Sequence, residues 1–143
     1  MIRISFPAHQ FRIKEADGKE WIFDEFRKQW VRLTPEEWVR QNILQYLVQV
    51  KSYPPSLIAV EKEIMVGELK KRFDILIYRN NQPWMMIECK EINVPIDESV
   101  LKQILTYHSK LQVHFLVVTN GNTSYGFAVS NGQINPIEDF PVF

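Results

Sequence analysis

Apolar and polar residues alternate along two neighbouring stretches of the chain, RFDILIY at 72–78 and MMIECK at 85–90. Because successive side chains of a strand point to opposite faces, this alternation predicts two strands, each with one buried face. Asp74 belongs to the first stretch, and Glu88 and Lys90 belong to the second. If the two stretches form one hairpin, strict alternation places all three charged side chains on a single face.

The position of the turn decides how close the two carboxylates come. A turn through residues 80–82 sets Asp74 directly opposite Glu88. Opposed residues in a sheet have Cβ atoms about 5 Å apart, and like charges at that distance repel each other. We therefore expect a cation between the two carboxylates, either a bound divalent metal ion or the ammonium group of Lys90.

Two other stretches have the three- and four-residue spacing of apolar positions that is typical of helices. The first begins at residues 34–37, TPEE, which supply an N-cap, a proline suited to the first helical position and a capping-box glutamate, and it runs to about Val50. The second begins after Asp97 and runs to about Leu111. Its predicted core stripe consists of Leu101, Ile104, Leu105 and a core or edge histidine, His108.

The remaining pattern predicts short strands. These are expected at 57–66, 113–118, 123–129 and 132–137, with a further hairpin at 11–24. The order of helices and strands predicts an α/β fold with a mixed central sheet and helices on its faces. We expect one globular domain, in which an N-terminal hairpin and arm, residues 1–33, pack on a core formed by residues 34–143.

Composition narrows the function classes further. The 17 basic and 17 acidic side chains give a net charge of zero, so any nucleic-acid site must be a local basic patch. The single cysteine excludes an internal disulfide and a CxxC zinc site. No apolar run approaches the roughly 18 residues that a membrane span needs. We expect a cytoplasmic protein with no membrane partner.

The hairpin has the ligand types that a hard divalent cation prefers. Mg²⁺ binds oxygen ligands, usually one or two carboxylates together with water and phosphate oxygens. Asp74 and Glu88 would supply the carboxylates for Mg²⁺ or Mn²⁺, and the backbone carbonyl of Cys89 a further oxygen. Lys90 would orient or deprotonate the attacking water and offset phosphate charge. This set of groups is suited to hydrolysis of a phosphodiester.

At these residues the chain resembles the PD-(D/E)xK nuclease superfamily. That superfamily has an aspartate on one strand and Asp/Glu-x-Lys on the next, and here Phe73 stands where its name has proline. The particular likeness is to the amino-terminal nuclease-like domain of type I restriction enzyme R subunits and its small stand-alone relatives. It rests on residues 34–41, TPEEWVRQ, on the hairpin and on Gln103-x-x-x-Tyr107, and it covers about residues 34–120.

The resemblance implies a restriction-endonuclease-like core of the order α-β-β-β-α-β. It also implies a metal-dependent nuclease that hydrolyses phosphodiester bonds in DNA, linked to restriction or other DNA processing. The implied partners are DNA and a helicase, methyltransferase or other restriction subunit. Gln103 and Tyr107, which lie on one side of the second helix, would support the site and contact the substrate.

The superfamily often adds a glutamate from the first helix. Glu36 lies on the arc of this helix that faces the sheet, whereas Glu37 points about 100° away and is accounted for by the capping box. Glu36 is therefore the candidate for the site, with Arg40 as its ion partner or as a phosphate contact. The helix dipole alone also favours a glutamate in the first turn, so both interpretations stay open.

Basic and aromatic residues suggest how a partner would bind. Lys70, Lys71 and Arg72 lie two to four positions before Asp74 and place positive charge at the mouth of the site, where Arg72 would contact phosphate. Two alternatives keep the fold. The chain is then a catalytically inactive DNA-binding or assembly module, or it is an interaction domain or homodimer whose aromatic arm makes the contact. That arm contains Trp21, Phe23, Phe26 and Trp30.

Overall fold

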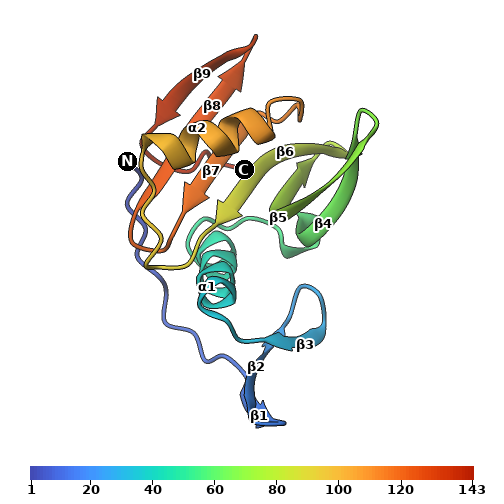
Figure 1. Ribbon diagram of the computed structural model, residues 1–143, viewed down its shortest axis with the longest axis vertical. Coiled ribbons are helices and arrows are strands. Elements are labelled where there is room, and N and C mark those ends of the chain that lie inside the picture. The colour runs from blue at the N-terminus through green and yellow to red at the C-terminus, as the bar shows by residue number, and fades with distance from the viewer.

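The computed structural model describes residues 1–143 and contains two separate sheets and two α-helices (Figure 1). The main sheet has six strands in the order β4-β5-β6-β7-β8-β9, and only β6 and β7 are parallel to each other. The strands are β4 (Ile58–Val66), β5 (Leu69–Arg79), β6 (Gln82–Cys89), β7 (Phe115–Thr119), β8 (Ser124–Ser130) and β9 (Gln133–Ile137). This mixed sheet confirms the predicted α/β class and the order α-β-β-β-α-β of the core.

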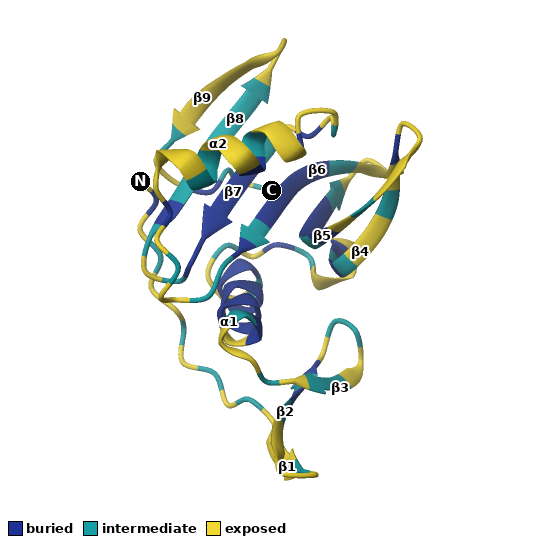
Figure 2. Cartoon of the chain, in the orientation of Figure 1, coloured by how far each residue is buried: buried dark blue, intermediate teal, exposed yellow.

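The two helices cover opposite faces of this sheet. Helix α1 (Pro35–Gln49) packs in one apolar cluster with Val117 of β7, and helix α2 (Glu98–Tyr107) in another with its neighbour Val118. Because adjacent strand residues point to opposite faces, the helices lie on opposite sides. Buried residues concentrate in α1 and β5–β7, whereas most of α2 is exposed (Figure 2). Neither helix is long and apolar enough to span a membrane.

Helix α2 is shorter and less buried than the sequence predicts. Its N-cap is Asp97 as expected, but it ends at Tyr107 rather than near Leu111. His108 has non-helical backbone angles, so the chain leaves the helix there. The ammonium group of Lys71 donates a hydrogen bond to the backbone carbonyl of Tyr107. Within the helix only Ile104 is buried, and it packs in a small cluster with Val118 of β7.

The β5–β6 hairpin has the predicted register at the site but a different turn. The turn contains two residues, Asn80 and Asn81, rather than three, and both have positive φ, as in a type I′ turn. An irregularity between Ile77 and Tyr78 shifts the register by one residue. Ile75 therefore pairs with Ile87, and Asp74 is level with Glu88, as the sequence predicts.

A small second sheet projects from the core beneath α1 (Figure 1). It consists of β1 (Ile13–Ala16), β2 (Lys19–Asp24) and β3 (Gln29–Arg32), all antiparallel. The first two strands confirm the predicted hairpin, but β3 falls in a stretch that the sequence pattern left as a connecting arm. Four residues are too few to establish a period of two.

Candidate active site

The start of α1 places two acidic side chains beside the end of the hairpin. Thr34 caps the helix, since its Oγ1 accepts a hydrogen bond from the backbone N–H of Glu37 at 3.1 Å. The side chain of Glu37 does not return to the cap as a capping box requires. It is buried and accepts hydrogen bonds from Arg27 at 2.8 Å and Arg40 at 2.6 Å. The predicted cap by Thr34 is therefore present, but the side chain of Glu37 does not complete a capping box.

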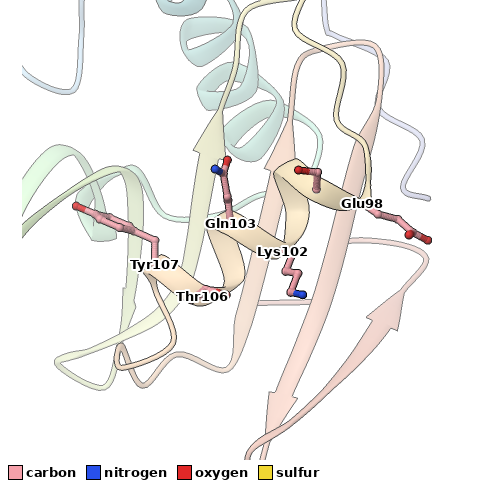
Figure 3. A pocket seen from close by; sticks show the side chains of 6 residues that line it. Glu98, Lys102, Gln103, Thr106 and Tyr107 are labelled. Atoms are coloured by element: carbon pink, nitrogen blue, oxygen red, sulfur yellow. The ribbon is translucent and has the colours of Figure 1, made fainter.

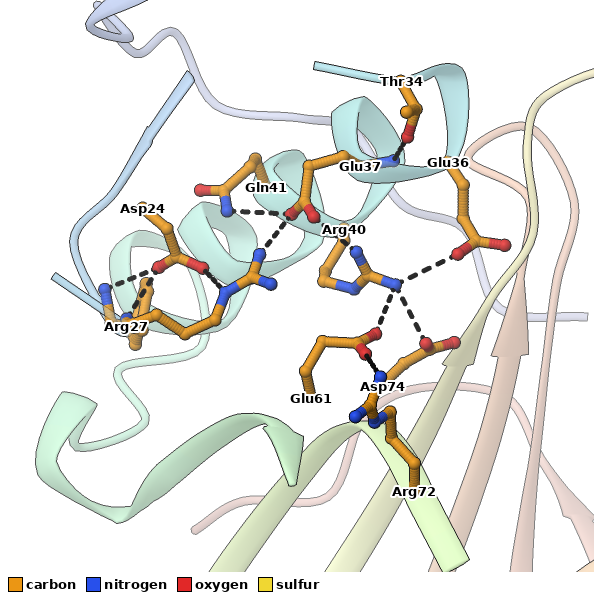
Figure 4. Close-up of polar contacts among 11 residues, drawn as sticks. Asp24, Arg27, Thr34, Glu36, Glu37, Arg40, Gln41, Glu61, Arg72 and Asp74 are labelled. Carbon is orange, nitrogen blue, oxygen red and sulfur yellow. Dashed lines mark hydrogen bonds and ion pairs between the residues drawn. The ribbon is translucent and has the colours of Figure 1, made fainter. Parts of the chain in front are cut away.

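Arg40 is the centre of an ion-pair network (Figure 4). Its Nη2 atom lies 2.9 Å from Asp74 Oδ1 and 2.8 Å from Glu61 Oε1. The same Nη2 lies 3.1 Å from Glu36 Oε2, and Nη1 lies 2.6 Å from Glu37 Oε1. The predicted pair between Glu36 and Arg40 is therefore present. Burial alone would lower the pKa of the guanidinium, but the surrounding carboxylates raise it overall, so Arg40 stays charged.

The network continues from α1 to the small sheet. Arg27 bridges Glu37 and the fully buried Asp24 at the end of β2. Asp24 also accepts hydrogen bonds from the backbone N–H groups of Phe26 at 2.7 Å and Arg27 at 3.0 Å. Figure 4 shows these side chains as one series from the small sheet to β5. The small sheet is thus joined to α1 close to Asp74.

Both oxygens of Asp74 have partners. Oδ1 accepts from Arg40, and Oδ2 accepts from the backbone N–H of Cys89 at 2.8 Å. The alternation of β5 is interrupted here, because Phe73 packs in the same cluster as Leu76 rather than with Ile75. Asp74 therefore bonds to a residue of α1, while Glu88 faces α2, although the two positions are level with each other.

Glu88 has a much poorer set of partners. Its Oε2 atom is buried without a hydrogen bond and lies 3.7 Å from Nε2 of His108. The other ring nitrogen of His108, Nδ1, is also buried without a partner. Burial raises the pKa of the Glu88 carboxyl above its ordinary value, and His108 and Lys90 offset only part of this effect.

The cations next to Asp74 and Glu88 therefore differ from the shared cation that the sequence predicts. The cations that the structure supplies are Arg40 for Asp74 and the ring of His108, when protonated, for Glu88. Lys90 instead lines a pocket beside Glu88.

That pocket brings together five of the residues that the sequence indicates. It has a volume of about 510 Å³. Its lining consists of Arg72, Glu88, Lys90, Gln103, Ile104, Tyr107 and His108. The other candidates, Asp74, Glu36 and Arg40, lie outside it in the neighbouring network, and the hydrogen bond from the Cys89 amide to Asp74 connects the two groups.

The helix side of this pocket opens onto the outer surface of α2. Gln103 and Tyr107 also line a second, larger hollow of about 700 Å³ with Lys102 and Thr106 (Figure 3). Tyr107 is exposed, and the ammonium group of Lys71 lies 4.3 Å from the centre of its ring. The predicted pair Gln103 and Tyr107 thus forms the border between the two hollows.

Comparison with protein families identifies the chain. The family model described as the N terminus of type I restriction enzyme R proteins matches residues 35–141. The chain belongs to this family. No curated protein matches it significantly. Membership of the family supports a restriction-related role in DNA processing. The match extends beyond the 34–120 of the sequence resemblance to include β8 and β9, and it leaves out β1, β2 and β3.

Two further residues of this family member, Glu61 and His108, contribute to the site, and neither is among the site residues that the sequence predicts. Glu61 of β4 binds Arg40, and its neighbours Val60 and Lys62 pair with Ile75 and Phe73, so it lies level with Asp74. Its positive φ of 52° in mid-strand is strained, at a cost of about 1–3 kcal/mol. Strand register could have placed Glu61 near Asp74. His108 is buried, as expected for a core or edge histidine, but nothing in its spacing indicates the contact with Glu88.

The donor set fits a divalent cation that is completed by water and substrate. Asp74 and Glu88 are hard oxygen ligands, and Glu88 Oε2 is a buried acceptor with no partner. No group of three or more His, Cys, Asp and Glu side chains is arranged to hold a metal ion. Any cation would therefore depend on these two carboxylates, the Cys89 carbonyl and phosphate oxygens.

Proposed function

We propose that this family member is a metal-dependent nuclease that hydrolyses phosphodiester bonds in DNA. The supporting observation is the pocket in which Glu88 and Lys90, at the end of β6, meet Gln103 and Tyr107 of α2. In this pocket, residues of β6 and α2 converge on Glu88, whose Oε2 atom has no hydrogen bond. A strand face that was exposed only to solvent would not require such an arrangement. The proposed substrate is DNA because of the restriction-related family.

Each residue has a proposed role. Asp74, Glu88 and the carbonyl of Cys89 hold Mg²⁺ or Mn²⁺, which when bound polarises the phosphate and lowers the pKa of water. Lys90 orients the attacking water and offsets the charge of the phosphate. Arg72, Gln103 and Tyr107 contact the substrate from the walls of the pocket. Glu88, Lys90, Arg72, Gln103 and Tyr107 line the pocket, whereas Asp74 lies next to it and contacts the Cys89 amide.

Arg40 and Glu36 act from outside the pocket. Arg40 holds Asp74 in position through the 2.9 Å ion pair, and Glu36 contacts Arg40 while half of its side chain stays exposed. We therefore propose that Glu36 positions water or metal at the entrance rather than in the pocket itself. Glu37, buried between Arg27 and Arg40, is the structural member of the pair.

Lys90→Ala is the sharpest test of this function. We expect cleavage of plasmid DNA in the presence of Mg²⁺ or Mn²⁺, and a loss of about 100-fold or more in Lys90→Ala, the scale of general acid–base catalysis. Lys110→Ala, an exposed lysine outside the pocket, is the matched control and should cleave normally. Unchanged cleavage by Lys90→Ala would contradict the mechanism, and circular dichroism checks that the fold survives.

A specific observation favours one alternative, a module that binds DNA or assembles with other restriction subunits without cutting. Asp74 is already neutralised by Arg40, so its carboxylate does not need a metal ion in order to be stable. Calorimetric titration with Mg²⁺ in the presence of DNA separates the two functions. Heat that disappears in Glu88→Gln supports the nuclease, whereas DNA binding without any metal heat supports the module.

The partners proposed for either function are DNA and a helicase or methyltransferase subunit of a restriction system. A homodimer stays a prediction, which light scattering of the purified protein would test.

A further inference from the structure

The outer face of the β1-β2-β3 sheet carries only basic and aromatic side chains at its centre. Lys14 is paired with Trp21, which is paired with Arg32, and Phe23 is paired with Trp30. Paired residues share a face. The cationic–aromatic face therefore contains Arg12, Lys14, Arg32, Trp21, Phe23 and Trp30, with the pair Ala16 and Lys19 at its end next to the turn.

The opposite face of the same sheet is entirely different. It contains Ile22 and Asp24, which are fully buried toward the body of the protein. It also contains Glu15 and Glu20, which are paired with each other. Basic residues and acidic residues are thus segregated onto the two faces of a sheet in a chain whose net charge is zero.

The cations of the cationic–aromatic face lie over the aromatic rings rather than beside carboxylates. The Arg12 guanidinium carbon is 4.5 Å from the centre of the Phe23 ring, and the Lys14 ammonium is 4.3 Å from that of Trp30. Arg32 lies 5.7 Å from the ring of Trp21. All three cations are exposed, and none of them forms a salt bridge. Their charge is therefore available to an anionic partner.

We propose that this face binds single-stranded DNA. Aromatic rings on a strand surface offer stacking platforms for unpaired bases, and the basic side chains that lie over these rings reach the phosphates. A duplex offers the phosphates but keeps its bases stacked on one another, so it would use the charges alone. The combination on this face, three rings and three unpaired cations, fits the single strand best.

The site is separate from the pocket at Glu88. The strands β1, β2 and β3 precede residue 35, where the family match begins. They are nevertheless joined to α1 through Arg27 and Glu37 at 2.8 Å, so a bound strand is held beside the nuclease-like core. The choice of DNA over RNA rests on the proposed function, but the binding itself does not depend on cleavage.

Fluorescence anisotropy with labelled oligonucleotides tests the proposal. The full chain is titrated in EDTA, which prevents cleavage, against dT20, rU20 and a duplex of about the same length. We expect dT20 to bind most tightly. The variant Arg12→Gln/Lys14→Gln/Arg32→Gln should bind about ten-fold or more weakly, and the slope of log affinity against log salt should fall by about 2. Trp30→Leu should bind dT20 about five-fold or more weakly.

Lys28→Gln is the matched control. Lys28 is an exposed cation in the turn between β2 and β3, and it lines a hollow with Gln45 and Val48 of α1 rather than the cationic–aromatic face. The variant Lys28→Gln should keep most of the wild-type affinity for dT20. Tryptophan fluorescence checks that each variant is folded. Equal losses in Lys28→Gln and in the triple variant, or no binding of dT20 at low salt, would overturn the proposal.

The titrations with rU20 and with the duplex identify the kind of nucleic acid that binds. Tighter binding of rU20 overturns the choice of DNA, and equal binding of the duplex overturns the role of stacking. The variant Glu88→Gln separates this proposal from the nuclease. If Glu88→Gln still binds dT20 but the wild type never cleaves DNA, the proposed function fails and the single-strand site stands.

Discussion

Asp74 and Glu88 are level with each other on neighbouring strands, but their environments differ. Asp74 receives a hydrogen bond on each oxygen, one from Arg40 and one from the amide of Cys89. Glu88 is almost as buried, yet its Oε2 atom has no hydrogen bond and its closest cationic partner, His108, lies 3.7 Å away. One carboxylate is part of the framework, whereas the other is poorly compensated.

The difference indicates which of the two is free to act. A buried charge without partners is costly, and proteins keep such groups mainly where function needs them. Asp74 is pinned by groups that stabilise the fold, so its removal should affect stability first. Glu88 faces a pocket with Lys90, so its removal should affect metal or substrate binding while the fold becomes more stable.

The largest effect should come from removing Arg40. Arg40→Ala leaves Asp74, Glu61 and Glu37 close together without their shared cation, and breaking a buried ion network of this kind costs about 3–5 kcal/mol. Urea unfolding measures this loss. Arg40→Lys keeps the charge but cannot donate to four carboxylates at once. Its free energy of unfolding should therefore lie between those of the wild type and Arg40→Ala. A loss below about 1 kcal/mol would mean that the network is not a framework.

The matched pair Asp74→Asn and Glu88→Gln should change stability in opposite directions. Asp74→Asn weakens charge-assisted hydrogen bonds and should lower the free energy of unfolding by about 2 kcal/mol at pH 8. Glu88→Gln removes a poorly paired buried charge and should raise it by about 1 kcal/mol. Both are measured in EDTA, so that no metal contributes.

The pH dependence gives Glu88→Gln a second readout. Because the pKa of Glu88 is raised by burial in the folded state, the folded protein holds this proton more firmly than the unfolded chain does. Stability therefore falls as the pH rises from the ordinary glutamate pKa through the higher folded value. The gain in Glu88→Gln should be present at pH 8 and vanish near pH 4. A gain that is equal at both pH values would contradict this cause.

This contrast marks where prediction from sequence succeeds. Local period and turn chemistry were enough to predict α1, the hairpin and the level positions of Asp74 and Glu88. The prediction that the two carboxylates share one face is wrong, because alternation in β5 is interrupted at Phe73 and Asp74 contacts α1 while Glu88 faces α2. The convergence of Gln103 and Tyr107 on Glu88 followed from the family resemblance.

The partners of the two carboxylates could not be predicted in the same way. Arg40 was expected to bind Glu36, but its simultaneous contact with Glu61 and Asp74 joins α1, β4 and β5, and no local pattern encodes such a meeting. The same holds for His108, which reaches Glu88 only because α2 ends at Tyr107 and the chain turns there.

The smallest effect should come from an exposed ion pair, which sets the scale for the others. Lys51 and Asp139 lie 2.8 Å apart, but 63% of the Asp139 side chain is exposed. Their hydrogen bond lowers the pKa of Asp139 only in a setting that water and salt can screen. Asp139→Asn should cost less than about 1 kcal/mol, and about 0.5 M NaCl should remove most of that difference.

The loss in Arg40→Ala should persist at the same salt, because its partners are buried. If salt abolished both losses equally, the network around Asp74 would be no more than surface charge, and its contrast with Glu88 would disappear.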